Sequence, residues 1–342
     1  MITAAPALTP EKAVLSLPVD SWQNHWRQAI RDPAELLQAL GLDGSALGVS
    51  AEALAQFALR VPRSFVARMR HGDPADPLLR QVLPIDEEMR IVPGFSFDAV
   101  GDGAAKKATG VIQKYRGRAL LVTTGSCAIN CRYCFRRHFD YAGENAAKGG
   151  WRDAVAVIAA DPDIDEIILS GGDPLSLATS KLAELTDALA TIPHLKRLRI
   201  HSRLPVVLPE RVDDALIQWL TGLPWPVAFV LHANHANEFD AQIDTVLARI
   251  RGTGAQLLNQ AVLLRGINDD LDALAALSER SFAAGVMPYY LYQLDKVQGA
   301  AHFEVSDDKA LALHAGLMAR LSGYLVPKLV REIAGDTSKR PL

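Results

Sequence analysis

Residues 118–138 read Arg118-Ala-Leu-Leu-Val-Thr-Thr-Gly-Ser-Cys127-Ala-Ile-Asn-Cys131-Arg-Tyr-Cys134-Phe-Arg-Arg-His138. The run up to Thr124 is apolar and β-branched, which predicts a buried strand, and a glycine then ends it. All three cysteines of the chain follow within eight residues, at a C-x3-C-x2-C spacing. Three thiolates this close can hold three irons of a cubane [4Fe–4S] cluster, which leaves the fourth iron open to a small molecule.

Other interpretations of these cysteines start from the same residues. A disulfide framework would leave one cysteine over. A zinc site needs four ligands, and His138 could complete a Cys3His set, which would make the chain a non-catalytic zinc module on an α/β scaffold. Structural zinc sites usually pair two short knuckles across a longer loop, and this stretch has one. Arginines also stand beside the sulfurs, and cations lower the pKa of a thiol toward the metal-binding thiolate.

Composition excludes several classes of protein. The 342 residues allow one large domain or two small ones, and 49% apolar residues can build a substantial core. A net charge of −3 gives no sign of nucleic-acid binding. We see no signal peptide and no apolar run long enough to span a membrane. Clustered, reduced cysteines fit a cytoplasmic protein.

Residues 1–100 differ from the rest of the chain and predict a mostly helical N-terminal region. Ser21–Ile30 has apolar residues at helical spacing. Asp32, followed by Pro33, can cap a second helix, and Ser50 can cap a third.

From about residue 118, short β-rich runs alternate with amphipathic helical patterns at a spacing of roughly 30 residues, the size of a βα unit. This alternation predicts an α/β fold with a parallel sheet and right-handed crossovers, either open or closed into a barrel. The predicted strands are Ala119–Thr124, Glu166–Ser170, Arg197–His201, Val227–His232, Gln256–Leu263 and Val286–Tyr292. The predicted helices include Leu182–Ala190, Val212–Leu220, Ile243–Ile250 and Leu271–Phe282.

Chemically active residues recur at the carboxyl ends of these strands. Each is weak evidence alone, because a Gly-Gly-Asp-Pro is usually a turn and a strand-end histidine is usually structural. Their recurrence at one edge predicts a site there, as in barrel enzymes generally. They are Gly171, Gly172 and Asp173 after the second strand, His201 and Arg203 after the third, His232 at the end of the fourth, Gln260 in the fifth, and Tyr289, Tyr290, Tyr292 and Asp295 at the sixth.

The cysteine motif, with an aromatic residue before its last cysteine, resembles the radical S-adenosylmethionine (SAM) superfamily. Further stretches resemble one family within it, lysine 2,3-aminomutase, from about residue 85 to the end. The resemblance implies a radical SAM partial (βα)6 barrel over residues 101–325 and a C-terminal segment, 326–342, that carries a lysine for pyridoxal phosphate (PLP). The stretches are Cys127–Phe139, Leu169–Leu175, Ser202–Arg211, His232–Glu238, Asn259–Asp269 and Pro288–Asp295.

The resemblance also implies roles for single residues. Cys127, Cys131 and Cys134 would bind the [4Fe–4S] cluster, whose open iron would bind SAM. The other SAM contacts would be Gly171, Gly172, Asp173, His232 and Gln260. Tyr115 and Arg118 would contact PLP, and Lys339 would form the aldimine with it. Arg136 would pair with the substrate carboxylate, while Asp295 and Glu332 would hold the substrate ε-ammonium.

Two departures from the family pattern stand near the end of the chain. The run before Lys339, Ala334–Ser338, has fewer glycines than the family has, and Glu332 stands where the family has an aspartate. A longer acid changes the reach of the carboxylate, so the geometry at the ε-amine and strict specificity for free lysine are open.

The short chain and the segments Trp22–Leu42 and Gly323–Glu332 resemble the branch that serves elongation factor P. The expected function is conversion of (S)-α-lysine to (R)-β-lysine, which a separate lysyl ligase attaches to that factor. The expected partners are L-lysine and an electron donor such as flavodoxin or ferredoxin. The alternative is a free-standing aminomutase that makes β-lysine for metabolism or osmoprotection.

Overall fold

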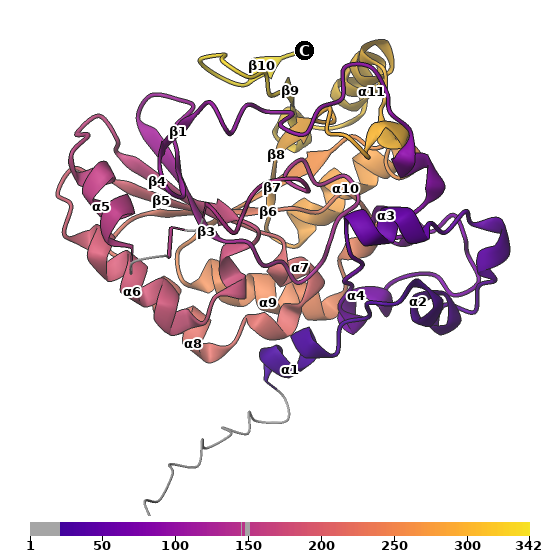
Figure 1. Ribbon diagram of the computed structural model, residues 1–342, viewed down its shortest axis with the longest axis horizontal. Helices are drawn as coiled ribbons and strands as arrows, with labels where there is room; N and C mark the ends of the chain where they lie inside the picture. Colours follow the sequence, from indigo (N-terminus) through magenta and orange to yellow (C-terminus); the bar gives the residue numbers. More distant parts are fainter. Residues whose placement is uncertain (1–20, 145, 148–150) are drawn as a thin grey trace, which may run out of the picture.

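The computed structural model describes residues 21–144, 146–147 and 151–342. The strands of these residues form one sheet, in which spatial order follows chain order (Figure 1). Neighbours from β3 to β9 are parallel, while β1, β2 and β10 are added antiparallel at the two ends. No pairing joins β10 to β1 in the described residues, so the sheet is an open partial barrel. The strands are β1 (Lys106–Ala108), β2 (Val111–Ile112), β3 (Arg118–Thr124), β4 (Glu166–Gly171), β5 (Arg197–Ser202), β6 (Val227–Leu231), β7 (Gln256–Val262), β8 (Met287–Tyr292), β9 (Lys328–Arg331) and β10 (Arg340–Pro341).

The six predicted parallel strands are confirmed as β3 to β8, with ends that differ by at most one residue from those expected. Helices follow the strands and lie outside the sheet (Figure 1). The four predicted crossover helices are confirmed, and three further helices, Arg152–Ala159, Leu204–Val207 and Asp307–Arg320, were not anticipated. The helices from residue 151 onward are α5 (Arg152–Ala159), α6 (Thr179–Ala190), α7 (Leu204–Val207), α8 (Asp214–Thr221), α9 (Ala241–Gly252), α10 (Leu271–Ala283) and α11 (Asp307–Arg320).

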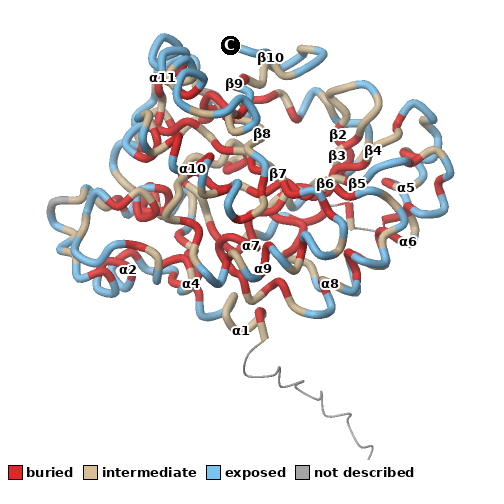
Figure 2. Tube along the Cα trace, turned by 180° about the vertical axis from the view of Figure 1, so that it is seen from behind, coloured by how far each residue is buried: buried red, intermediate tan, exposed pale blue. Residues whose placement is uncertain are grey.

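The two faces of the curved sheet do different work. Successive side chains of a strand point to opposite faces. Leu121, Leu169 and Ile200 point outward, are wholly buried and pack in the main core beneath the helices. Their neighbours on the inner face, such as Leu120 and Ser170, line a cavity instead. Buried residues accordingly follow the strands, and exposed residues follow the outer surface of the helices (Figure 2).

The N-terminal region contains helices and no named strand within residues 21–100, although the helices are short and turns join them. Two predicted caps are confirmed: Asp32 accepts a hydrogen bond from the Ala34 amide at 2.9 Å, and Ser50 accepts one from the Ala53 amide at 3.2 Å. The helices are α1 (Trp22–Arg27), α2 (Pro33–Ala39), α3 (Ala51–Gln56) and α4 (Arg63–Val66).

The C-terminal segment from residue 326 is integrated into the sheet. Its strand β9 pairs in parallel with β8, and β10 turns back along β9. Lys339 therefore stands directly before a strand of the barrel. No helix in the described part of the chain is both long enough and apolar enough to cross a bilayer.

Candidate active site

One cavity of about 470 Å³ lies inside the partial barrel and is lined from β2 to the last strands. Alternate residues of the parallel strands reach it, as expected for the inner face of a curved sheet. All fourteen residues to which the resemblance assigns a role line this cavity: Tyr115, Arg118, Cys127, Cys131, Cys134, Arg136, Gly171, Gly172, Asp173, His232, Gln260, Asp295, Glu332 and Lys339. The structure thus brings together positions more than 220 residues apart, while their chemical roles stay predictions.

The cysteine loop after β3 forms one wall of the cavity. It is held from outside by residues 58–60: the Asn130 amide donates to the Arg60 carbonyl at 3.0 Å, and Arg60 Nη1 donates to the Cys127 carbonyl at 3.1 Å. Burial raises the pKa of the Cys127 thiol and raises that of Cys134 to about 11. The neighbouring arginines do act to lower both pKa values, as expected, but burial outweighs them and the net shift of both thiols is upward.

His138 does not join the cysteines. Its Nε2 lies 3.0 Å from the Gln298 carbonyl, and its ring stacks edge-on against Phe97. Across the residues described, no three His, Cys, Asp or Glu side chains gather closely enough to hold a single metal ion. The Cys3His zinc interpretation therefore has no support. A cubane makes a different demand, because each thiolate binds a different iron and the three sulfurs need not converge on one point.

The Gly-Gly-Asp turn after β4 packs directly under the cysteine loop. Gly171 has φ +119°, and a Cβ on Gly172 would lie 2.5 Å from the Ser126 carbonyl oxygen, so side chains are excluded here. The Asp173 carboxylate accepts from Ser202 Oγ at 2.8 Å and from the Arg203 amide at 2.7 Å. Asp173 therefore joins β4 to the end of β5, a role that its expected contact with SAM did not suggest.

Two histidines meet above the middle strands. The ring centres of His201 and His232 are 5.6 Å apart, and the ring planes meet at 62°. Burial lowers the pKa of His232 to about 3 and that of His201 also far below its usual value, so both rings are neutral. Nε2 of His201 is buried and bonds to no described residue. A buried polar atom without a partner is costly unless a bound molecule satisfies it, so this wall fits a polar ligand.

A series of ion pairs with alternating charges lines another part of the cavity. Lys339 Nζ lies 2.7 Å from Glu332, which lies 2.9 Å from Lys114 Nζ. Lys114 also pairs with Asp102 at 2.7 Å, and Asp102 pairs with Arg136 Nε at 2.7 Å. Burial opposes ionisation of Glu332 and Asp102, but the neighbouring cations outweigh it and lower the pKa of both carboxyls. Both carboxyls are therefore ionised.

Sequence reasoning missed two members of this series of ion pairs, Asp102 and Lys114. Lys114 precedes Tyr115, which the resemblance had already placed at the site, and that adjacency was an available signal. Asp102 stands in a Gly-Asp-Gly turn with nothing to distinguish it.

Asp295 lies near these ion pairs and is not a member of the series. Burial raises its pKa to about 7, and the nearby charge of Glu332 adds to the rise. Its Oδ1 accepts no hydrogen bond from the described residues. An unpaired buried carboxylate fits an incoming cation.

Aromatic rings and a second cation surround Lys339. Its Nζ lies 5.5 Å from the ring centre of Tyr115 and 5.1 Å from that of Tyr292. The Arg118 guanidinium lies 4.5 Å from the Tyr115 ring. An amine, flat apolar faces and a guanidinium are the groups that a phosphorylated aromatic aldehyde requires for covalent attachment, stacking and anion binding. The donor set therefore fits PLP.

The fold is an open (βα)6 barrel, and its site combines a three-cysteine loop with a charged lysine pocket at the carboxyl edge of the strands. This combination is typical of an enzyme. The chain is 50% identical over 326 residues, 94% of both chains, to the L-lysine 2,3-aminomutase of Escherichia coli K12. The chain belongs to the L-lysine 2,3-aminomutase family, which is a family of isomerases.

Other relatives extend this result. The protein of that name from Haemophilus influenzae is 44% identical, covering 93% of this chain and 94% of the relative. The one from Clostridium subterminale is 30% identical, covering 94% and 79%. No protein-family model matches the chain. Among solved structures, a radical SAM methyltransferase from Sphaerobacter thermophilus aligns with a TM-score of 0.44 and 17% identity over 65% of this chain and 68% of that one.

Proposed function

We propose that this chain is a radical SAM lysine 2,3-aminomutase that converts (S)-α-lysine to (R)-β-lysine with a [4Fe–4S] cluster, SAM and PLP. One observation carries the proposal: a single cavity is lined both by three thiols and by a lysine–carboxylate cluster. The names of the relatives supply the substrate class. The thiols offer a place for the cluster with SAM, and the lysine–carboxylate cluster offers a place for PLP and the substrate.

The cluster would be held by Cys127, Cys131 and Cys134, and PLP by Lys339 and Arg118. When bound, the cluster with SAM supplies a carbon-centred radical, and PLP supplies the conjugated system that lets an amino group move between neighbouring carbons. The protein's own work is binding, alignment and exclusion of water.

Substrate binding follows from the charges of the cavity. Arg136 is buried and is held through Nε by Asp102, which orients the guanidinium, so its outer nitrogens can meet a carboxylate. Asp295 can receive the ε-ammonium, because its Oδ1 has no partner among the described residues. Glu332 already binds two lysines of the chain, so we assign it the weaker share of ammonium binding.

The finer features of the proposal rest on resemblance. The likeness of Trp22–Leu42 and Gly323–Glu332 to the elongation factor P branch supports delivery of β-lysine to that factor through its lysyl ligase. A cytoplasmic location and reduction by flavodoxin or ferredoxin accompany this assignment. A ligase gene next to this one would favour it, whereas a neighbouring β-lysine acetyltransferase gene would favour the free-standing aminomutase.

The decisive experiment is anaerobic purification followed by an ultraviolet–visible spectrum, iron and PLP assays, and incubation with SAM, reductant and lysine. We expect about four irons and one PLP per chain, and β-lysine as product. A reconstituted protein that carries both cofactors and forms no β-lysine would overturn the proposal.

Lys339 provides a separate test. Lys339→Ala should abolish covalently bound PLP and leave the iron content unchanged, because the contacts of Lys339 are with Glu332 and two tyrosine rings rather than with the cysteine loop. The matched control is Lys309→Ala, which removes an exposed lysine of α11 that pairs with Asp269. Covalent PLP retained in Lys339→Ala would place the attachment at another lysine.

A further inference from the structure

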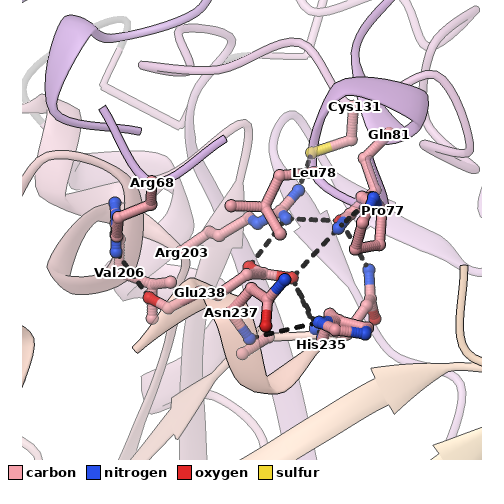
Figure 3. Close-up of polar contacts among 12 residues, drawn as sticks. Arg68, Pro77, Leu78, Gln81, Cys131, Arg203, Val206, His235, Asn237 and Glu238 are labelled. Carbon is pink, nitrogen blue, oxygen red and sulfur yellow. Dashed lines mark hydrogen bonds and ion pairs between the residues drawn. The ribbon is translucent and has the colours of Figure 1, made fainter. Parts of the chain in front are cut away.

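A buried arginine contacts one of the three cysteines. Arg203 follows β5 and is 6% exposed. Its Nη1 donates to Cys131 Sγ at 2.7 Å, and its Nη2 donates to Gln81 Oε1 at 2.6 Å and to Glu238 Oε2 at 2.9 Å. Figure 3 shows the guanidinium between the sulfur on one side and Glu238 on the other. The role assigned to the cysteines does not require such a contact.

Both partners of this ion pair are fixed in place. The Arg203 amide donates to Asp173, and the guanidinium lies 5.4 Å from the Phe65 ring centre and 5.7 Å from that of Tyr133. Glu238, in the 3₁₀ turn η6 (Ala236–Glu238), is wholly buried. These contacts hold the Arg203 guanidinium against the Cys131 sulfur.

The other carboxylate oxygen of Glu238, Oε1, also accepts hydrogen bonds. It accepts from the amides of Asn234 and His235 at 2.8 and 3.2 Å, and from Gln81 Nε2 at 3.1 Å. These bonds hold the negative charge on the far side of Arg203 from the sulfur (Figure 3). A buried ion pair is tolerable only with such full satisfaction.

We propose that Arg203 and Glu238 are a positioning pair that orients Cys131 and sets the reduction potential of the cluster bound there. The inference rests on the proposed function, since it requires that cluster. A donor on a ligand sulfur stabilises the added electron and raises the potential, and hydrogen bonds to sulfur are a recognised determinant of cluster potentials. Glu238 acts in the opposite sense, because its negative charge partly cancels that of Arg203.

A purely structural role makes a different prediction. Arg203 also joins the N-terminal region to the barrel through Gln81. If that contact were its whole role, loss of either Arg203 or Glu238 would impair folding or iron retention, and the two losses would not shift the reduction potential in opposite directions. Charge tuning has a sign: removing the cation should lower the potential, and removing the anion should raise it. Two variants of one ion pair therefore separate the two roles.

The experiment is a redox titration of the reconstituted holoprotein, followed by electron paramagnetic resonance of the reduced cluster, for wild type, Arg203→Met and Glu238→Gln. We expect a negative shift for Arg203→Met and a positive shift for Glu238→Gln. The control is Arg211→Met, which removes a buried arginine that donates to the Leu175 carbonyl at 2.6 Å and contacts no cysteine. Its potential should equal that of wild type. Melting curves of the iron-free proteins report any loss of folding separately.

The outcomes are distinct. Shifts in the same direction, or no shift with full iron content, would overturn the proposal. Loss of iron from both variants but not from Arg211→Met would reduce the pair to a structural clamp and also overturn the tuning. A wild-type protein that binds no cluster under reconstitution would refute the proposed function before any variant is compared.

Discussion

Asp295 shows how burial and a neighbouring negative charge together make a site suited to a cation. In water its carboxyl would ionise near pH 4, but in the cavity its pKa is raised to about 7 by burial and by the charge of Glu332. Between these pH values the unfolded chain releases a proton that the folded chain keeps, so stability falls as pH rises. Above pH 7 the whole cost is present.

Asp295→Asn should therefore stabilise the protein, and the gain should grow from pH 4 to pH 7 and then level off. Three pKa units set an upper bound of roughly 4 kcal/mol at 1.36 kcal/mol per unit. Thermal melting at pH 5 and pH 8 measures the difference. An equal gain at pH 5 and pH 8 would show instead that the carboxyl is already ionised in the folded protein at pH 5.

Arg136 should tolerate lysine poorly. Its Nε is taken by Asp102 and its Nη1 donates to Ser170 Oγ at 3.2 Å, so only a planar fork can keep both bonds and still meet a substrate carboxylate. We expect Arg136→Lys to weaken lysine binding at least tenfold, measured by calorimetry on PLP-loaded protein. Arg199→Lys is a useful control, since Arg199 lines the same cavity but pairs with Glu166. Equal affinity in Arg136→Lys and wild type would remove the assigned role.

At the scale of elements, the turn after β4 determines where the cysteine loop lies. Gly172→Ala places a methyl group 2.5 Å from the Ser126 carbonyl oxygen, against backbone that cannot rotate away. We expect a loss of about 1–3 kcal/mol, as for overpacked sites, together with less iron per chain. Gly252→Ala in α9 has open space around the new methyl and should be neutral or slightly stabilising. Iron content and chemical denaturation of both variants test this contrast.

The strands that sequence could locate share one physical property. Most of the strands from β3 to β8 contain a short apolar stretch, and β5 alternates polar with apolar residues, so their patterns are local. The strands β9 and β10 are short and bear Lys328, Arg331 and Arg340, and only pairing with distant residues makes them strands.

The site divides in the same way. Parallel strands bring their carboxyl ends to one edge, which is why strand-end residues could be gathered from sequence. The bond from Lys114 to Glu332 spans 218 positions, and no local pattern announces it. Likewise, the net direction of the thiol pKa shifts depends on burial, which the neighbouring arginines in sequence do not reveal.

For the whole molecule, the N-terminal region braces the cysteine loop through a buried cluster of charges. Glu88 accepts from Arg132 Nε at 2.8 Å and from Arg137 Nη2 at 2.7 Å, and all three side chains are buried. Residues on both sides of Cys134 are thus tied to one carboxylate of residues 21–100. The region covers the barrel and also supports the site.

Glu88→Ala should cost about 3–5 kcal/mol, because it leaves two guanidinium groups buried without their carboxylate. The exposed pair of Glu35 with Arg63 offers the control, and Glu35→Ala should cost no more than about 1 kcal/mol. Unfolding in urea measures both values. Equal losses would mean that water replaces the carboxylate at Arg132 and Arg137.

Strand order that follows chain order has a consequence for biosynthesis. A ribosome delivers the barrel strand by strand, and each new strand finds its partner already made. The three thiols emerge early, whereas Lys339 comes only after β9 has been added. A nascent chain can therefore complete the cysteine loop long before Lys339 reaches the cavity, and the lysine–carboxylate cluster is assembled last.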